Sequence, residues 1–187
     1  MKSVLISIKP QWVEKIVNGE KTIELRKSRP KIETPFKCYI YATKSRDRIV
    51  LKDDRVFEIS KALTGKVIGE FVCDRVYKWE CKNRLEILES FPTWRASYML
   101  FVDDLEKTCL TYDDLWDYGK GKPLYGWHIS DLKIYDKPKE LSEFNRPCSY
   151  AGLCFSCDRA KFTSKGDRIC QAMITRPPQS YMYVEEI

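Results

Sequence analysis

The first residues of the chain show three successive hydrophobic patterns. Val4–Ile8 is almost continuously apolar, which predicts a buried strand. Residues 10–18 repeat apolar side chains every three or four positions, which predicts a short helix that begins at Pro10 and ends before Gly19. The alternating stretch from Thr22 to Arg26 predicts a second strand.

The rest of the chain contains mostly strand patterns. Further strands are expected at Phe36–Ala42, Val67–Val76, Leu124–Tyr135 and Tyr181–Val184. Helical spacing is found at Phe57–Leu63 and at Tyr112–Tyr118 after the capping residue Thr111, and Pro138–Phe144 suits a short helix or turn. Because regular β-α-β alternation is absent, this order favours a mainly β, α+β barrel over a doubly wound sheet.

Charge is distributed unevenly along the chain. Residues 1–100 contain 21 basic and 13 acidic residues, whereas residues 101–187 contain 12 and 14. The N-terminal excess indicates a phosphate-bearing partner, although a solvated basic face would give the same count. The apolar runs are too short for a membrane span or a signal peptide, so we expect a cytoplasmic protein without membrane contact.

The most specific motif joins the first helix to the second strand. Ser7-Ile8-Lys9-Pro10 ends the first strand, and Gly19-Glu20-Lys21-Thr22-Ile23-Glu24-Leu25-Arg26-Lys27 leads from the helix into the second. This arrangement resembles the ASCH family, whose signature is a strand before a helix and then Gly-x-Lys-x-x-Glu-x-Arg. The stretch Val67–Phe71 looks like a later strand of that family. Residues 125–130 and 176–181 resemble its phage and bacterial members.

The resemblance implies a PUA-like mixed β-barrel with a few short helices. We expect residues 1–144 to form this barrel. Residues 145–187 are expected to form a cysteine-rich, zinc-knuckle-like extension that ends in a strand packed on the barrel. The resemblance also implies a cleft near the end of the first helix, and RNA or a nucleotide is the ligand that it suggests.

Four charged residues are the candidates to line this cleft. Strand alternation places Glu24 and Arg26 on one face of the second strand, opposite two apolar residues that suit the core. Lys9 and Lys21 flank the two ends of the helix. Together these groups can neutralise a phosphate and form hydrogen bonds to a base edge. The alternative is an ion pair of Glu24 with Arg26 or Lys21 that only holds the helix-to-strand turn in place.

Aromatic residues and the single histidine are further candidates for ligand contact. Trp12, Tyr41 and Trp127 could stack on a base, although aromatic residues at strand spacing usually belong to a core. His128 follows Trp127 and suits either a position at the edge of the cleft or a structural one. We therefore count Trp127 and His128 among the candidate nucleotide-binding residues.

A catalytic role is the alternative to a binding role. Some ASCH members are amidohydrolases that deacetylate 4-acetylcytidine with a lysine, a threonine and a glutamate, and others are reported as ribonucleases. The resemblance assigns the lysine to Lys21 and the glutamate to Glu70. Glu24 occupies the threonine position, and a carboxylate does not simply replace a hydroxyl nucleophile. An ASCH-type enzyme of this chain would therefore rely on Lys21 with Glu24 or Glu70.

Three cysteines lie in apolar, strand-like contexts, namely Cys38, Cys73 and Cys109. Because structural disulfides are rare in the cytoplasm, we expect these three residues to be buried thiols.

Four other cysteines form a cluster with the spacing C-x5-C-x2-C-x12-C, namely Cys148, Cys154, Cys157 and Cys170. A C-x2-C pair lets two thiolates reach one metal ion from a tight turn, and the two flanking cysteines complete a tetrahedron. The spacing therefore predicts a closed, structural zinc site. Reduced thiols without metal, or a redox dithiol at Cys154 and Cys157, are the alternatives.

Overall fold

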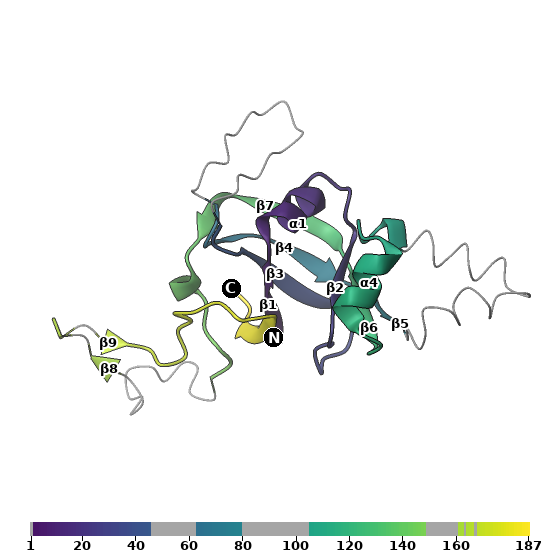
Figure 1. Ribbon diagram of the computed structural model, residues 1–187. Coiled ribbons are helices and arrows are strands. Elements are labelled where there is room, and N and C mark those ends of the chain that lie inside the picture. The colour runs from purple at the N-terminus through teal and green to yellow at the C-terminus, as the bar shows by residue number, and fades with distance from the viewer. Residues whose placement is uncertain (1, 46–62, 80–104, 149–160, 163, 167) are drawn as a thin grey trace, which may run out of the picture.

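A computed structural model of the chain describes residues 2–45, 63–79, 105–148, 161–162, 164–166 and 168–187 (Figure 1). Most of the helix expected at Phe57–Leu63 falls outside these ranges. Two of the four clustered cysteines, Cys154 and Cys157, also lie outside the described residues.

The larger sheet has five strands in the order β10-β1-β3-β4-β7. Its members are β1 (Lys2–Ile8), β3 (Phe36–Ala42), β4 (Val67–Cys73), β7 (Ser130–Lys139) and β10 (Tyr181–Glu185). β1 pairs with β3 in parallel, and the other neighbours are antiparallel. The last strand of the chain thus lies beside the first, with Ser3 opposite Val184.

A second sheet has three antiparallel strands in the order β2-β6-β5. They are β2 (Ile23–Arg26), β6 (Leu124–His128) and β5 (Val76–Trp79). A separate two-stranded hairpin is formed by β8 (Lys161–Phe162) and β9 (Arg168–Ile169).

Two α-helices and one short 3-10 helix accompany these strands in the described part of the chain. They are α1 (Pro10–Val17), α4 (Tyr112–Gly119) and η1 (Leu141–Glu143). Thr111 caps α4 as predicted, and Asp114 completes a capping box with it. Neither helix, among the residues that can be described, has the length and apolar character that a membrane crossing requires.

The mainly β character predicted from the sequence is confirmed, but the described residues of the expected mixed barrel form two separate sheets, and no closed barrel is found among them. The stretch Val67–Val76 was expected to be one strand, but it divides after Cys73, and its continuation β5 joins the small sheet. The stretch Leu124–Tyr135 likewise divides at Ile129, whose backbone N–H donates to the carbonyl of Thr22. These two breaks direct consecutive strands into different sheets. The fold is mainly β with few helices.

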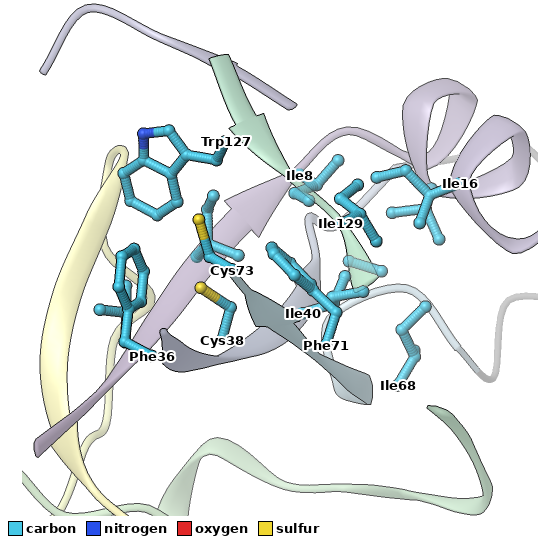
Figure 2. Packing of buried hydrophobic residues seen from close by; sticks show 14 residues of the cluster. Ile8, Ile16, Phe36, Cys38, Ile40, Ile68, Phe71, Cys73, Trp127 and Ile129 are labelled. Atoms are coloured by element: carbon cyan, nitrogen blue, oxygen red, sulfur yellow. The ribbon is translucent and has the colours of Figure 1, made fainter. Parts of the chain in front are cut away.

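The main core lies between the two sheets and under α1. Trp127 of β6 is fully buried and meets Phe36 of β3 edge to face, with ring centroids 5.7 Å apart. Figure 2 shows this pair beside Cys38 and Cys73, with Ile8, Ile16 and Ile129 filling the space toward the helix. The two thiols are buried as predicted. Cys109, by contrast, is only half-buried, because it sits in a turn with a positive φ of 55°.

The opposite face of the large sheet carries a second apolar cluster. Tyr39 of β3 packs edge to face on Phe144, and Ile174 and Val184 join the same cluster. All four side chains are buried. The chain beyond residue 144 therefore contributes core residues to the large sheet.

Gly69 of β4 marks a close approach between neighbouring strands. The pairing of β4 with β7 shifts register beside it, as expected for a bulge. A Cβ atom at this position would collide with the backbone of Lys133 and Ile134. Only glycine therefore lets β7 approach β4 at this point.

Candidate functional site

A pocket of about 800 Å³ opens where the end of β1, the start of α1, β2 and α4 meet. The segment Thr175–Gln179, just before β10, forms a further wall of this pocket. That segment is attached to β1 through Ser7, whose hydroxyl donates to the carbonyl of Pro178 at 2.7 Å and whose N–H donates to the carbonyl of Ser180 at 2.9 Å. The pocket thus brings together residues from both ends of the chain.

Three charged side chains form what we call the floor of the pocket, namely Lys21, Glu24 and Arg26. All three are buried, with relative exposures of 3%, 6% and 7%. Glu24 lies between the two cations, 3.5 Å from the ammonium of Lys21 and 2.9 Å from the guanidinium of Arg26. The two ion pairs considered from the sequence are therefore both present, and the same residues line the pocket.

The floor residues are held in place by backbone carbonyls. Lys21 donates from Nζ to the carbonyl of Thr108 at 2.6 Å, and Arg26 donates from Nη2 to the carbonyl of Ser7 at 2.7 Å. The Nε atom of Arg26 is buried and has no hydrogen-bond partner in the described structure. Such an unsatisfied donor is costly, and that cost is tolerated most readily at a functional site.

Burial lowers the pKa of Lys21, while the neighbouring Glu24 carboxylate opposes that shift. The ammonium also lies 5.2 Å from the ring centroid of Trp12, a cation–π distance. The carbonyl that Lys21 contacts belongs to Thr108, in the segment that follows Leu105. This segment is joined to β2, because the N–H groups of Thr22 and Ile23 both donate to the carbonyl of Lys107. Lys21 is thus fixed in position.

Three aromatic residues line the pocket, namely Trp12, Tyr41 and Tyr118. The first two were candidates from the sequence. Tyr118 was not, because α4 reaches the site only through the tertiary fold. Its side chain is 37% exposed, and the ammonium of Lys27 lies 4.7 Å from its ring centroid. The pocket therefore has both apolar faces and charged groups.

We call the exposed basic residues at the entrance the mouth of the pocket, namely Lys9, Lys44 and Arg176. Lys9 is the N-cap of α1, Lys44 follows β3, and Arg176 lies in the C-terminal wall. The pocket as a whole is lined by five basic and two acidic residues. This balance favours an anionic ligand.

The remaining sequence candidates lie away from this pocket. Trp127 is buried in the core, and His128 pairs through Nδ1 with Asp74 at 2.6 Å on the small sheet. Glu70 accepts a hydrogen bond from the hydroxyl of Tyr135 at 2.5 Å. None of these residues lines the pocket, so the fold brings together Lys9, Lys21, Glu24 and Arg26 but not Glu70, Trp127 or His128.

The predicted zinc cluster is only partly within the described residues. Cys148 is half-buried and Cys170 is exposed, and both are free thiols. The residues described here contain no group of three or more histidine, cysteine or acidic side chains that could hold a metal ion. Cys154 and Cys157, which complete the proposed set, are not among them.

Comparison with known proteins identifies similarities of sequence and of fold. The family model described as "ASCH domain" matches residues 6–92. No curated protein matches the chain in sequence. A tyrosine-to-phenylalanine variant of the ASCH protein from Zymomonas mobilis has a similar structure, with a TM-score of 0.56 and 16% identity over 100% of this chain and 92% of that one.

Two further structures of the Zymomonas mobilis protein agree with this similarity. The unmodified protein gives a TM-score of 0.51 at 17% identity, covering 98% of this chain and 88% of that one. A serine-to-alanine variant gives 0.56 at 17% identity, covering 98% and 89%. At such identity the likeness concerns the fold. The sequence match to an ASCH domain covers residues 6–92, and over the rest of the chain the similarity to the ASCH protein is one of fold.

Proposed function

We propose that this protein binds RNA or a nucleotide in the pocket above Lys21, Glu24 and Arg26. The observation that carries the proposal is the floor itself. It places a carboxylate between two cations at the base of a pocket of about 800 Å³. Such volumes suit small organic ligands.

The chemistry of the floor suits a nucleobase. A base edge presents hydrogen-bond donors and acceptors side by side. The Glu24 carboxylate can accept more hydrogen bonds than its two ion pairs use, and Lys21 and Arg26 supply donors. Trp12 and Tyr118 offer ring surfaces on which a base can stack.

The geometry supports binding more than the acetylcytidine hydrolase considered from the sequence. That reaction would need Lys21, a hydroxyl nucleophile and a carboxylate around one substrate. Glu70 does not line the pocket, and its carboxylate is engaged by Tyr135 and lies 3.8 Å from the ammonium of Lys37. Glu24 is in the pocket, but it is paired with both cations and offers no hydroxyl nucleophile.

The proposal is tested by titrating the purified protein and its Lys21→Ala variant with a single-stranded RNA oligonucleotide, the four ribonucleoside monophosphates and 4-acetylcytidine. We expect saturable binding by the wild type and a loss of about tenfold or more in the variant, because a buried charged donor is removed. Each mixture is also analysed for hydrolysis products.

The matched control is Lys137→Ala, which removes a lysine that is exposed on β7 and does not line the pocket. Equal affinity of the wild type and Lys21→Ala for every ligand would contradict the pocket assignment. Turnover that disappears in Lys21→Ala would replace the binding proposal with the enzymatic one.

We also propose that the four clustered cysteines hold a structural zinc ion. The hairpin of β8 and β9 supports this proposal. Lys161 pairs with Ile169, so the first and last residues of the hairpin lie side by side. Cys170 directly follows β9, and Cys157 precedes β8 by four positions in the sequence.

Metal analysis of protein purified without added metal tests this second proposal. One zinc ion per chain is expected, and Cys157→Ser should release it. Cys73→Ser is the control, because Cys73 lies in the main core. Zinc-free protein, or metal content unaffected by Cys157→Ser, would contradict the proposal.

A further inference from the structure

We infer that the ligand of the pocket carries a phosphate group, which the mouth residues Lys44 and Arg176 bind together with Lys9 while the base faces the floor. This inference rests on the proposed function and assigns the residues that hold the phosphate of its ligand. It selects a nucleotide or an RNA strand and disfavours a free nucleoside. Lys44 and Arg176 lie outside the N-terminal sequence motif, so the inference comes from the fold.

The cations of the floor are already engaged. Lys21 contacts Glu24 and the carbonyl of Thr108, and Arg26 contacts Glu24 and the carbonyl of Ser7. A phosphate placed there would compete with the carboxylate of Glu24 for the same two cations. The floor is therefore better suited to a neutral base edge than to a dianion.

The cations of the mouth are available for an anion. Lys9, Lys44 and Arg176 are exposed. Within the described residues, their side chains form no hydrogen bond or ion pair. Each comes from a different segment of the chain, and all three line one pocket. Lysine and arginine side chains that converge from separate segments on one opening suit the binding of a phosphate group.

Arg176 is exposed but its backbone is held on both sides. On one side, Ile174 is buried and its N–H donates to the carbonyl of Phe144 at 2.9 Å. On the other, the carbonyl of Pro178 accepts from the Ser7 hydroxyl. Only three residues separate these two anchors, and they include Pro177, which restricts the backbone further. The guanidinium is therefore presented from a fixed segment.

Lys44 is positioned by Gly65. A Cβ atom at residue 65 would lie 3.0 Å from Cγ and 3.1 Å from Cε of Lys44, so the lysine stem lies across the glycine. Gly65 also has a φ of +87°, and its N–H donates to the carbonyl of Ala42 at 2.7 Å. The glycine thus provides both the turn and the surface that directs Lys44.

Besides Glu24 of the floor, Asp114 is the other acidic residue that lines the pocket. Its Oδ2 atom accepts hydrogen bonds from the N–H and the hydroxyl of Thr111 at 2.8 and 2.6 Å. These bonds hold the carboxylate at the start of α4. The carboxylate keeps its negative charge, but among the lining residues the three mouth cations outnumber it.

The test compares the four ribonucleosides with their 5′- and 3′-monophosphates in titrations of the wild type, Lys44→Ala, Arg176→Ala and the double variant. For at least one base, we expect the monophosphate to bind the wild type about tenfold more tightly than the nucleoside. Each single variant should lose most of that difference, and nucleoside affinity should change less than about twofold. The control Lys137→Ala, which removes an exposed lysine outside the pocket, should retain the full preference for the monophosphate.

The outcomes separate this inference from the proposed function. Equal affinity for nucleoside and monophosphate, or a phosphate preference that persists in the double variant, overturns the phosphate site and leaves the pocket assignment intact. Absence of binding by every nucleoside, monophosphate and RNA oligonucleotide overturns the proposed function and this inference with it. Circular dichroism of the exposed-residue variants confirms that the fold is retained.

Discussion

The floor and the mouth of the pocket both contain lysine and arginine side chains, but in opposite environments. At the floor, Lys21, Glu24 and Arg26 are buried and paired with one another. At the mouth, Lys9, Lys44 and Arg176 are exposed and have no partner in the described residues. Substitutions at the buried floor should lower stability strongly, whereas substitutions at the solvent-exposed mouth should change it little. The floor should therefore determine the stability of the protein, and the mouth should determine its preference for a negatively charged ligand.

The strongest test of this contrast is Glu24→Gln. Removing the carboxylate leaves Lys21 and Arg26 buried without a counter-charge, so we expect the free energy of unfolding to fall by about 3 to 5 kcal/mol. Urea denaturation measures the loss. Glu70→Gln is the matched control, because Glu70 is less buried and its amide could still accept from Tyr135, so a loss of about 1 kcal/mol is expected. Equal losses would remove the distinction.

The pH dependence of the floor offers a second test. Because burial lowers the pKa of Lys21 in the folded protein, the unfolded chain binds more protons between that pKa and the ordinary value of 10.5. Stability relative to Lys21→Met should therefore rise with pH through this window, while affinity for a nucleotide falls as the ammonium is lost. Urea midpoints and titrations at several alkaline pH values check both signs. A parallel pH dependence in wild type and variant would contradict them.

Gly65→Ala should disturb the mouth while leaving the floor paired. A side chain at φ +87° is strained and meets the stem of Lys44, so we expect about 1 kcal/mol of lost stability and a several-fold weaker binding of the monophosphate. Gly121→Ala, also at positive φ but with open space around its Cβ position, is the control for strain alone. If both variants bind the monophosphate like wild type, Gly65 does not position Lys44.

The smallest expected effect is that of Lys9→Ala on salt dependence. The variant should unfold at the same urea concentration as the wild type, because Lys9 is exposed and unpaired in the described structure. The slope of log affinity for an RNA oligonucleotide against log salt should decrease by about 0.7 if one phosphate contact is lost. An unchanged slope would exclude Lys9 from the phosphate site.

The floor could be predicted from the sequence because it lies within one short motif. Strand alternation alone separates Glu24 and Arg26 from Ile23 and Leu25, and Leu25 packs in an apolar cluster with Leu115, although it also lines the pocket. The helix and strand boundaries near the N-terminus follow from Pro10 and the hydrophobic spacing. Local rules were sufficient there, since all the residues concerned are neighbours in sequence.

Of the mouth residues, Lys9 belongs to the N-terminal motif and was a candidate from the sequence, but Lys44 and Arg176 could not be predicted in the same way. Arg176 and Lys44 reach the pocket only because β10 pairs with β1 and β3 ends beside it. No periodicity in the sequence encodes such distant pairings. The placement of Glu70 was missed for a related reason. Its strand was identified, but the face it presents depends on which neighbour pairs with β4.

Trp127 illustrates the ambiguity of aromatic residues. The same alternating pattern fits a ring that stacks on a ligand and a ring that fills a core. The two sheets of the fold decide between these positions, because Trp127 faces Phe36 and Tyr181 across the space between them. Hydropathy also predicts two continuous strands that the fold divides, one after Cys73 and one at Ile129. A change from one sheet to another leaves little trace in hydropathy.

The attachment of Ser7 to Pro178 and Ser180 has a consequence for the order of folding. The motif residues Lys21, Glu24 and Arg26 are synthesised well before the wall that completes their pocket, since Ser7 and Pro178 lie 171 positions apart in the sequence. A nascent chain therefore cannot engage its ligand until β10 has paired with β1 across almost the whole sequence, a pairing of very long contact order. Ligand binding would then report that β10 has paired with β1.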